Sequence, residues 1–265
     1  MEKRGNNQSI NYNLFKDKKA QVTIFIIIGI ALIALIVLSF LYFPQIGDVF
    51  TGGLKDPSEF FEDCIEEDLK ETTQTISLRG GNMDPELFYP YYGEKLSYLC
   101  YTNEYYVPCV VQEPMLKTHI EKEIKQEMDT EIKTCKGDLE SYYADRGYGV
   151  KMEDSKAKIK LLPERIALEI DGEISLSKGG ETQTYEGIEV SSKTKIYELA
   201  SIATSIVGWE SKYGDSETTT FMNYYHDIKV EKKKQTDGTT VYILTNRDTQ
   251  DKFQFASRSV AWPPA

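Results

Sequence analysis

The chain has 265 residues and a formal net charge of −11, and 40% of its residues are hydrophobic. This hydrophobic share is sufficient for a folded core. The acidic balance argues against a nucleic-acid-binding protein, because such proteins need clustered lysine and arginine to displace counterions from phosphates. We therefore expect no nucleic-acid partner.

Charge and hydropathy divide the first part of the chain. Residues 1–20 carry five basic and two acidic side chains, a net charge of +3, and residues 20–43 carry no charge, so residues 44–265 carry −14. Gln21–Phe43 is apolar throughout and, as a helix, is long enough to cross a hydrocarbon core of about 30 Å. The basic residues before this span place the N-terminus in the cytoplasm and residues 44–265 outside the cell.

The alternative for Gln21–Phe43 is a cleaved secretory signal. The apolar region of such a signal has about 7–15 residues and is followed by a small-residue cleavage site. This segment is longer, and Pro44–Asp48 is a poor site of that kind. The sequence therefore predicts a single-pass membrane protein with four parts. They are a basic cytoplasmic leader (1–20), a transmembrane helix (21–43), a linker (44–55) and an extracellular domain (56–265).

The junction Lys18-Lys19-Ala20-Gln21-Val22-Thr23 resembles the leader junction of archaeal type IV pilin-like proteins. In that family a short basic leader is followed by a small residue and then directly by the apolar helix. The resemblance implies that a prepilin peptidase cuts between Ala20 and Gln21 and leaves the helix intact. It also implies membrane partners, namely pilin-like or other membrane subunits, including copies of this chain. Phe25 departs from the pattern, because the fifth mature position in pilins is often glutamate.

The whole chain also resembles uncharacterised single-pass surface proteins of small-genome archaea. That resemblance implies a cell-surface location and brings no known activity.

Three helices are predicted after the linker. Asp56-Pro57-Ser58-Glu59 provides an N-cap, a proline at the first helical position and a glutamate at the third, and Arg79-Gly80-Gly81 ends this helix. Apolar residues at helical spacing predict a second helix at Pro114–Tyr143 and a third at Thr194–Tyr213. The apolar face of the third is expected to bury four residues: Leu199, Ile202, Ile206 and Trp209.

Alternating apolar and polar residues predict the strands. Lys95–Val111 is typical of a hairpin that turns near Thr102, and Asp171-Gly172 is typical of a turn between two later strands. The remaining strand predictions are 157–161, 166–170, 174–176, 228–230, 241–243 and 253–255. The order of elements predicts an α+β domain with helices packed on an antiparallel meander sheet. We expect a helical and hairpin part at 56–145 and a sheet part at 146–265.

All four cysteines lie in the predicted extracellular domain, and an even number there predicts disulfide bonds. Three pairings are possible. Cys100 and Cys109 lie on opposite strands of the expected hairpin, and Cys64 and Cys135 lie on or beside the apolar faces of two helices. We predict these two pairs. Reduced core cysteines and a zinc site are the alternatives, although zinc ligands usually occur as close Cys-x-x-Cys pairs.

The sequence contains few residues that point to catalysis. His119 and Glu123 lie one helical turn apart, but two ligands are too few for a metal site, and His226 is expected at the surface. Motifs of the GxSxG, HExxH, Walker A and GxGxxG types are absent from the sequence. We therefore expect no catalytic residues, metal or cofactor, and predict that the protein is not an enzyme.

The predicted function is that of a membrane-anchored structural or interaction protein at the cell surface, with a type IV pilin-like subunit as one form of it. The first alternative is a membrane-tethered adhesin or receptor-type binding module that does not assemble. The second is an exported enzyme, such as a hydrolase built on scattered carboxylates, that has no readable motif.

Overall fold

The computed structural model describes residues 27–34, 54–152 and 156–261. Residues 55–265 form one compact unit and residues 1–54 another. Of the predicted span Gln21–Phe43, residues 27–34 are described and are helical, while the rest of it, Ala20 and most of the linker lie outside the described residues. Within the described part of the chain, no helix is both long enough and apolar enough to cross a membrane.

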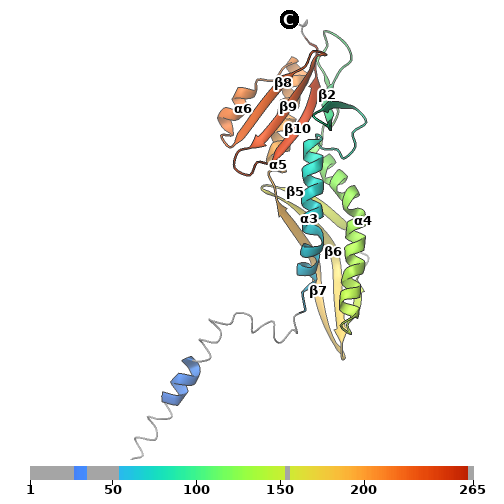
Figure 1. The fold of residues 1–265 in the computed structure, drawn as a ribbon, viewed down its shortest axis with the longest axis vertical. Helices are drawn as coiled ribbons and strands as arrows, with labels where there is room; N and C mark the ends of the chain where they lie inside the picture. The colour runs from blue at the N-terminus through green and yellow to red at the C-terminus, as the bar shows by residue number, and fades with distance from the viewer. Residues whose placement is uncertain (1–26, 35–53, 153–155, 262–265) are drawn as a thin grey trace, which may run out of the picture. The chain divides into compact units, whose positions relative to one another are not determined.

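The second unit combines helices with strands, and the prediction of an α+β domain is confirmed (Figure 1). The helices are α3 (Pro57–Leu78), α4 (Leu116–Ala144), α5 (Ile196–Tyr213) and α6 (Thr218–Tyr224). The first five strands are β1 (Phe88–Tyr91), β2 (Glu94–Tyr101), β3 (Val110–Val111), β4 (Gly149–Met152) and β5 (Ala157–Leu162). The others are β6 (Arg165–Lys178), β7 (Glu181–Lys193), β8 (Ile228–Lys234), β9 (Thr239–Asn246) and β10 (Lys252–Arg258).

The strands form two sheets rather than the single meander that we expected. The larger sheet has the order β1-β2-β10-β9-β8, with β3 beside β2, and the smaller sheet contains β4 to β7. In the smaller sheet β4 and β5 pair with successive parts of one edge of β6, and β7 pairs with the other edge. The pair β2–β10 is parallel. The prediction failed here because periodicity identifies a strand but does not identify a partner far away in the sequence.

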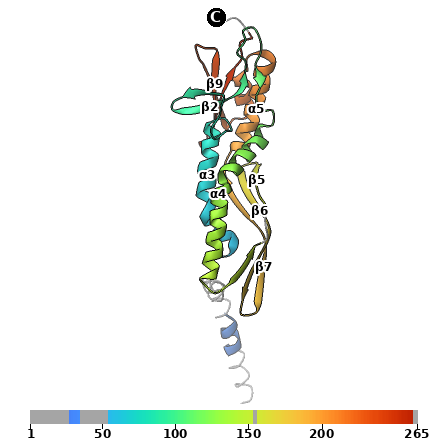
Figure 2. The same cartoon turned by 90° about the vertical axis from the view of Figure 1, so that its right-hand side faces the viewer.

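Helices α3 and α4 lie side by side and run antiparallel (Figures 1 and 2). As expected, the Asp56 side chain caps α3 by accepting the Glu59 N–H at 2.9 Å. The Tyr143 hydroxyl, at the end of α4, donates to the Lys55 carbonyl at 2.6 Å. At the other end of α3, Gly80 has a φ of 75°, and a Cβ there would lie 3.0 Å from the Ser97 Cβ. Glycine is therefore needed where α3 stops against the larger sheet.

The predicted turn at Asp171-Gly172 is wrong, because β6 continues through it as one strand. Ile170 pairs with Ile188 and Glu173 pairs with Glu186, so two residues of β6 face one residue of β7. This is a β-bulge, and Gly172 has the positive φ of 121° that a bulge can require. An Asp-Gly pair fits a bulge as well as a turn, since both need backbone conformations that glycine allows.

The predicted hairpin at Lys95–Val111 exists but is short. Cys100 pairs with Val111 and Tyr101 pairs with Val110, and the residues between these pairs form a loop. The main partners of β2 are instead β1 and β10. Helix α5 packs against β10, β9 and β2, so the loop of the hairpin lies beside α5 and the larger sheet.

Candidate functional site

Two disulfides account for all four cysteines, in the pairs that we predicted. Cys64–Cys135 joins α3 to α4 across 71 residues, and Cys100–Cys109 closes the loop after β2 across 9 residues. The sulfur-bearing side chains of Cys100, Cys109 and Cys135 are at most 3% exposed. Cys64, by contrast, is half-buried, and Cys109 lies in the loop before β3.

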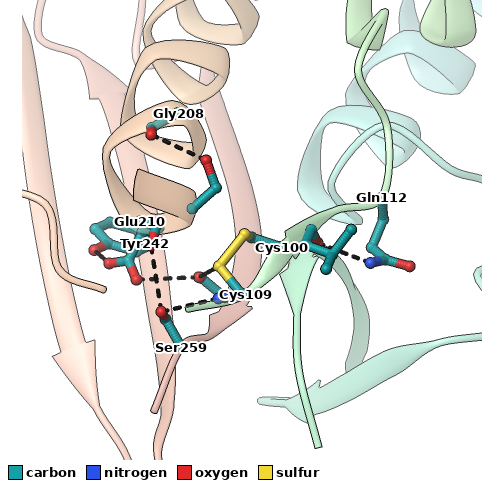
Figure 3. Close-up of a disulfide and its surroundings, with 10 residues drawn as sticks. Cys100, Cys109, Gln112, Gly208, Glu210, Tyr242 and Ser259 are labelled. Carbon is teal, nitrogen blue, oxygen red and sulfur yellow. Dashed lines mark hydrogen bonds between the residues drawn. A yellow bond between two sulfur atoms is a disulfide. The ribbon is translucent and has the colours of Figure 1, made fainter. Parts of the chain in front are cut away.

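Helix α5 presents a carboxyl group to the core where we expected a tryptophan. Trp209 is 49% exposed, whereas Glu210 is 2% exposed. The Tyr242 hydroxyl donates to Glu210 Oε1 (Figure 3). The Ser257 hydroxyl donates to Oε2 at 3.3 Å. The prediction of a buried Trp209 is wrong because Ile206 is followed one full turn later by Glu210, which continues the buried face.

The Glu210 carboxyl belongs to a polar cluster that reaches the Cys100–Cys109 disulfide. Ser259 accepts the Cys109 N–H at 3.2 Å, and its hydroxyl donates to the Glu210 carbonyl at 3.3 Å (Figure 3). The Ser257 oxygen lies 3.8 Å from Cys109 Sγ. These contacts connect α5, β9, β10 and the loop after β2.

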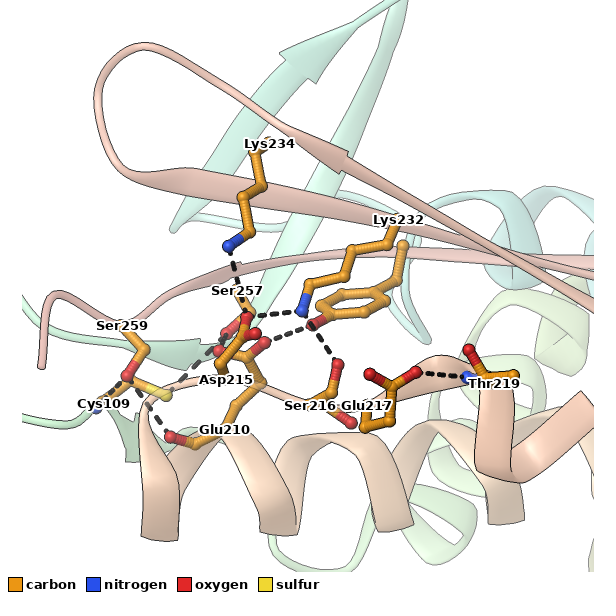
Figure 4. Close-up of polar contacts among 11 residues, drawn as sticks. Cys109, Glu210, Asp215, Ser216, Glu217, Thr219, Lys232, Lys234, Ser257 and Ser259 are labelled. Atoms are coloured by element: carbon orange, nitrogen blue, oxygen red, sulfur yellow. Dashed lines mark hydrogen bonds and ion pairs between the residues drawn. The ribbon is translucent and has the colours of Figure 1, made fainter. Parts of the chain in front are cut away.

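Burial controls the electrostatics of this cluster. Loss of solvation raises the pKa of Glu210, while the hydrogen bond from Tyr242 and the charge of Lys232 act in the opposite direction. Lys232 itself pairs with Asp215 and donates to the Ser216 carbonyl at 2.8 Å (Figure 4). Glu210 does not line either of the two grooves described below. The cluster cross-links α5 to the larger sheet.

A groove of about 560 Å³ lies where α3, the end of β7 and the β9–β10 turn meet. Lys70, Lys193 and Lys252 line it, one from each of α3, β7 and β10. The side chains of Gln74 and Gln254 also line it. Among the described residues, none of these five side chains has a hydrogen-bond or ion-pair partner. We call these five residues the lysine groove.

The β9–β10 turn that borders the lysine groove is fixed by a buried amide. Asn246 is 0% exposed, and its side-chain oxygen accepts the N–H groups of Asp248 and Thr249 at 3.0 and 2.9 Å. Gln250 in the same turn has a φ of 64°. The Asp251 carboxylate accepts the Lys195 N–H at 2.7 Å, so it is engaged with the start of α5 rather than with a groove lysine.

No known protein family, characterised protein or solved structure matches this chain. A functional argument therefore rests on the residues of this chain. The lysine groove could not be found from the sequence, because its lysines come from three distant segments. The burial of Glu210 did have a signal, since this residue lies four positions after Ile206 on the apolar face of α5.

A second groove, of about 660 Å³, lies between α4 and β5 and is also lined by lysines. Lys125 pairs with Asp129, which lies in the same groove, and Lys158 pairs with Asp171. Its exposed lining is mostly apolar, and Ile132, Ala157 and Ile159 contribute to it. Because carboxylates already neutralise part of its charge, it is a weaker candidate for a ligand site.

The two histidines do not converge with other ligand side chains. His119 Nε2 lies 2.7 Å from Asn82 Oδ1, and its Nδ1 lies 3.6 Å from a Glu113 carboxylate oxygen. Glu123 instead accepts the Met83 N–H at 3.1 Å, and His226 is exposed. In the part of the chain that the structure describes, no group of three or more His, Cys, Asp or Glu residues is arranged to hold a metal ion.

Proposed function

We propose that the protein is a membrane-anchored interaction protein of the cell surface, with its N-terminus in the cytoplasm and residues 44–265 outside. The observation that carries this proposal is the pairing of all four cysteines in two disulfides. Such bonds persist in oxidising compartments and are rare in the cytosol. The apolar segment Gln21–Phe43 supplies the anchor in this proposal, and the charge difference across it supplies the orientation.

The arrangement of polar groups supports binding more than catalysis. A catalytic acid or base needs a shifted pKa and access to a substrate. Glu210 has the raised pKa but is 2% exposed and lies away from the lysine groove. The lysine groove presents cations and amides, which can recognise an anionic ligand. The proposed function is therefore an interaction rather than a reaction.

The N-terminal leader divides this proposal into two forms. A pilin-like subunit is processed between Ala20 and Gln21 and contacts other membrane helices, including copies of itself. A tethered adhesin or receptor-type module keeps its leader and acts alone. The lysine groove is specific support for the second form, because a binding site is useful to a module that does not assemble.

The orientation can be tested with inserted protease sites. A recognition sequence for a specific protease, placed within residues 44–53, should be cut when the protease is added to intact cells. The same sequence placed within residues 5–15 should be cut only after lysis. The physical reason is that the basic leader stays on the cytoplasmic side while the acidic part is translocated. Protection of the first site on intact cells would overturn the proposed orientation.

Leader processing distinguishes the two forms. If the pilin-like form holds, mass analysis of protein from the membrane should find a chain that begins at Gln21. Ala20→Leu should block this cleavage, because the resemblance implies a requirement for a small residue there. Ala31→Leu, in the apolar segment, is the matched control and should leave cleavage unchanged. A chain that begins at Met1 in all three proteins would leave only the tethered module.

A further inference from the structure

We propose that the lysine groove binds a carboxylate-bearing sugar as part of an acidic polysaccharide. This inference rests on the proposed function, since a polymer of this kind meets the domain only outside the cell. The site is formed by Lys70 and Gln74 of α3, Lys193 of β7, and Lys252 and Gln254 of β10 (Figure 1 shows these elements).

The charge of the groove is opposite to that of the domain around it. Residues 44–265 carry a net charge of −14, whereas the groove lining contains three lysines and one carboxylate, Asp251. Asp251 is hydrogen-bonded to the backbone of Lys195. Elsewhere lysines such as Lys160 and Lys232 are paired with carboxylates. An anion is therefore attracted by the local charge of the groove and not by the field of the whole domain.

The other polar groups of the groove suit a sugar. A glutamine side chain both donates and accepts hydrogen bonds, as a sugar hydroxyl does, and Gln74 and Gln254 have no such partner among the described residues. Lysine acts on a carboxylate as a mobile point charge. Because the three lysines come from three elements, they suit a ligand with more than one carboxylate.

The lining disfavours two other classes of ligand. Of the described residues that line the groove, none is aromatic, so nothing there stacks on the base of a nucleotide. Leu78 and Ile166 are its apolar lining residues, and Ile166 is 0% exposed, so the groove lacks an apolar pocket for a peptide side chain. Its volume of about 560 Å³ lies within the usual range of about 300–1,000 Å³ for ligand pockets.

The test is calorimetric titration of the full-length protein, in a neutral detergent at low salt, with a trimer of galacturonic acid. We expect the trimer to bind. Its methyl-esterified form, which is the same sugar without the charges, should bind with an affinity at least about tenfold lower. Free galacturonic acid should bind more weakly than the trimer if the ligand is a polymer. Equal affinity per mole for both would indicate a free sugar acid and overturn the polysaccharide.

The groove is tested by a triple variant, Lys70→Gln with Lys193→Gln and Lys252→Gln. It should bind the trimer at least about tenfold more weakly than the native protein. The matched control changes three exposed lysines outside both grooves, Lys151→Gln with Lys212→Gln and Lys229→Gln, and alters the net charge equally. The control should retain affinity within about twofold, since distant exposed charges are largely screened. If the triple variant melts at a lower temperature than the native protein, Lys193→Gln alone replaces it and should also bind the trimer more weakly.

The inference would also be overturned if the trimer did not bind, or if the groove and control variants lost affinity equally. Binding of a polyglutamate peptide as tight as that of the trimer would assign an acidic peptide instead. Full competition by inorganic phosphate at equal concentration would assign a phosphate. Because these titrations use purified protein, their failure leaves the proposed surface location intact. Conversely, protection of the inserted protease site on intact cells would refute the proposed location of the domain outside the cell, and the affinity measured with purified protein would be unchanged.

Discussion

Replacing both Cys64 and Cys135 with alanine should lower the free energy of unfolding by about 4 kcal/mol, the larger of the two disulfide effects. The bond closes a loop of 71 residues, and the chain-entropy loss in the unfolded state grows with loop length. This amount is a large part of the stability of a typical domain, which is about 5–15 kcal/mol. Urea titration followed by circular dichroism measures it.

The Cys100–Cys109 pair is the internal control for this experiment. Its loop has 9 residues, so the same double replacement there should cost only about 2.5 kcal/mol. Reduction of the native protein should reproduce the sum of the two losses, because the pairs lie in different parts of the domain. A larger loss at Cys100–Cys109 than at Cys64–Cys135 would contradict the loop-length explanation.

Tyr242→Phe should destabilise the domain by about 1–3 kcal/mol, because it removes a hydrogen-bond donor from a buried carboxyl group. The donor is the Tyr242 hydroxyl, which bonds Glu210 Oε1. The cost should be smaller below the raised pKa of Glu210 than above it, because the lost bond is then one between neutral groups. Tyr98→Phe is the matched control. Its hydroxyl lies 2.8 Å from the Thr239 hydroxyl, so its cost should not change with the charge of Glu210.

The pH dependence of stability follows from the same group. The pKa of Glu210 is raised above its ordinary value of 4.5 by burial, so the folded domain favours the protonated form. The stability gained in this way is fully present below the unfolded pKa and is lost as the pH rises through the folded pKa. Glu210→Gln removes this loss. Its stability relative to the native protein should therefore rise as the pH increases from the ordinary pKa of 4.5 through the raised pKa of the folded domain, and a difference that does not change with pH would contradict the assignment.

The sequence predicted the local elements well and their partners poorly. The capping residues Asp56 and Glu59 located the start of α3, and the strands predicted at 228–230 and 241–243 fall within β8 and β9. The parallel pairing of β2 with β10 was not predictable, because the two strands are separated by about 150 residues and their side-chain pattern is the same in either direction. The Asp171-Gly172 pair shows that one dipeptide serves a turn and a bulge equally.

The candidate site was less predictable than the fold. Nothing in the sequence distinguishes Lys70, Lys193 and Lys252 from the other lysines. They line one groove only because α3, β7 and β10 meet in the folded domain. Glu210 was predictable in part, because its position on α5 follows the apolar face. Its partners Tyr242 and Ser257 were not, since they lie on strands whose facing depends on the order of the sheet.

The position of β10 between β2 and β9 has a consequence for how the domain folds as it emerges N-terminus first. Its residues, Lys252–Arg258, follow every other strand in sequence, yet they occupy the middle of the larger sheet. Until they arrive, β2 and β9 each expose an unpaired edge that can bind other chains. Long-range pairing of this kind also slows folding, because distant segments must meet before any contact stabilises them. Protection of these edges by a chaperone is therefore most needed during the last step of synthesis.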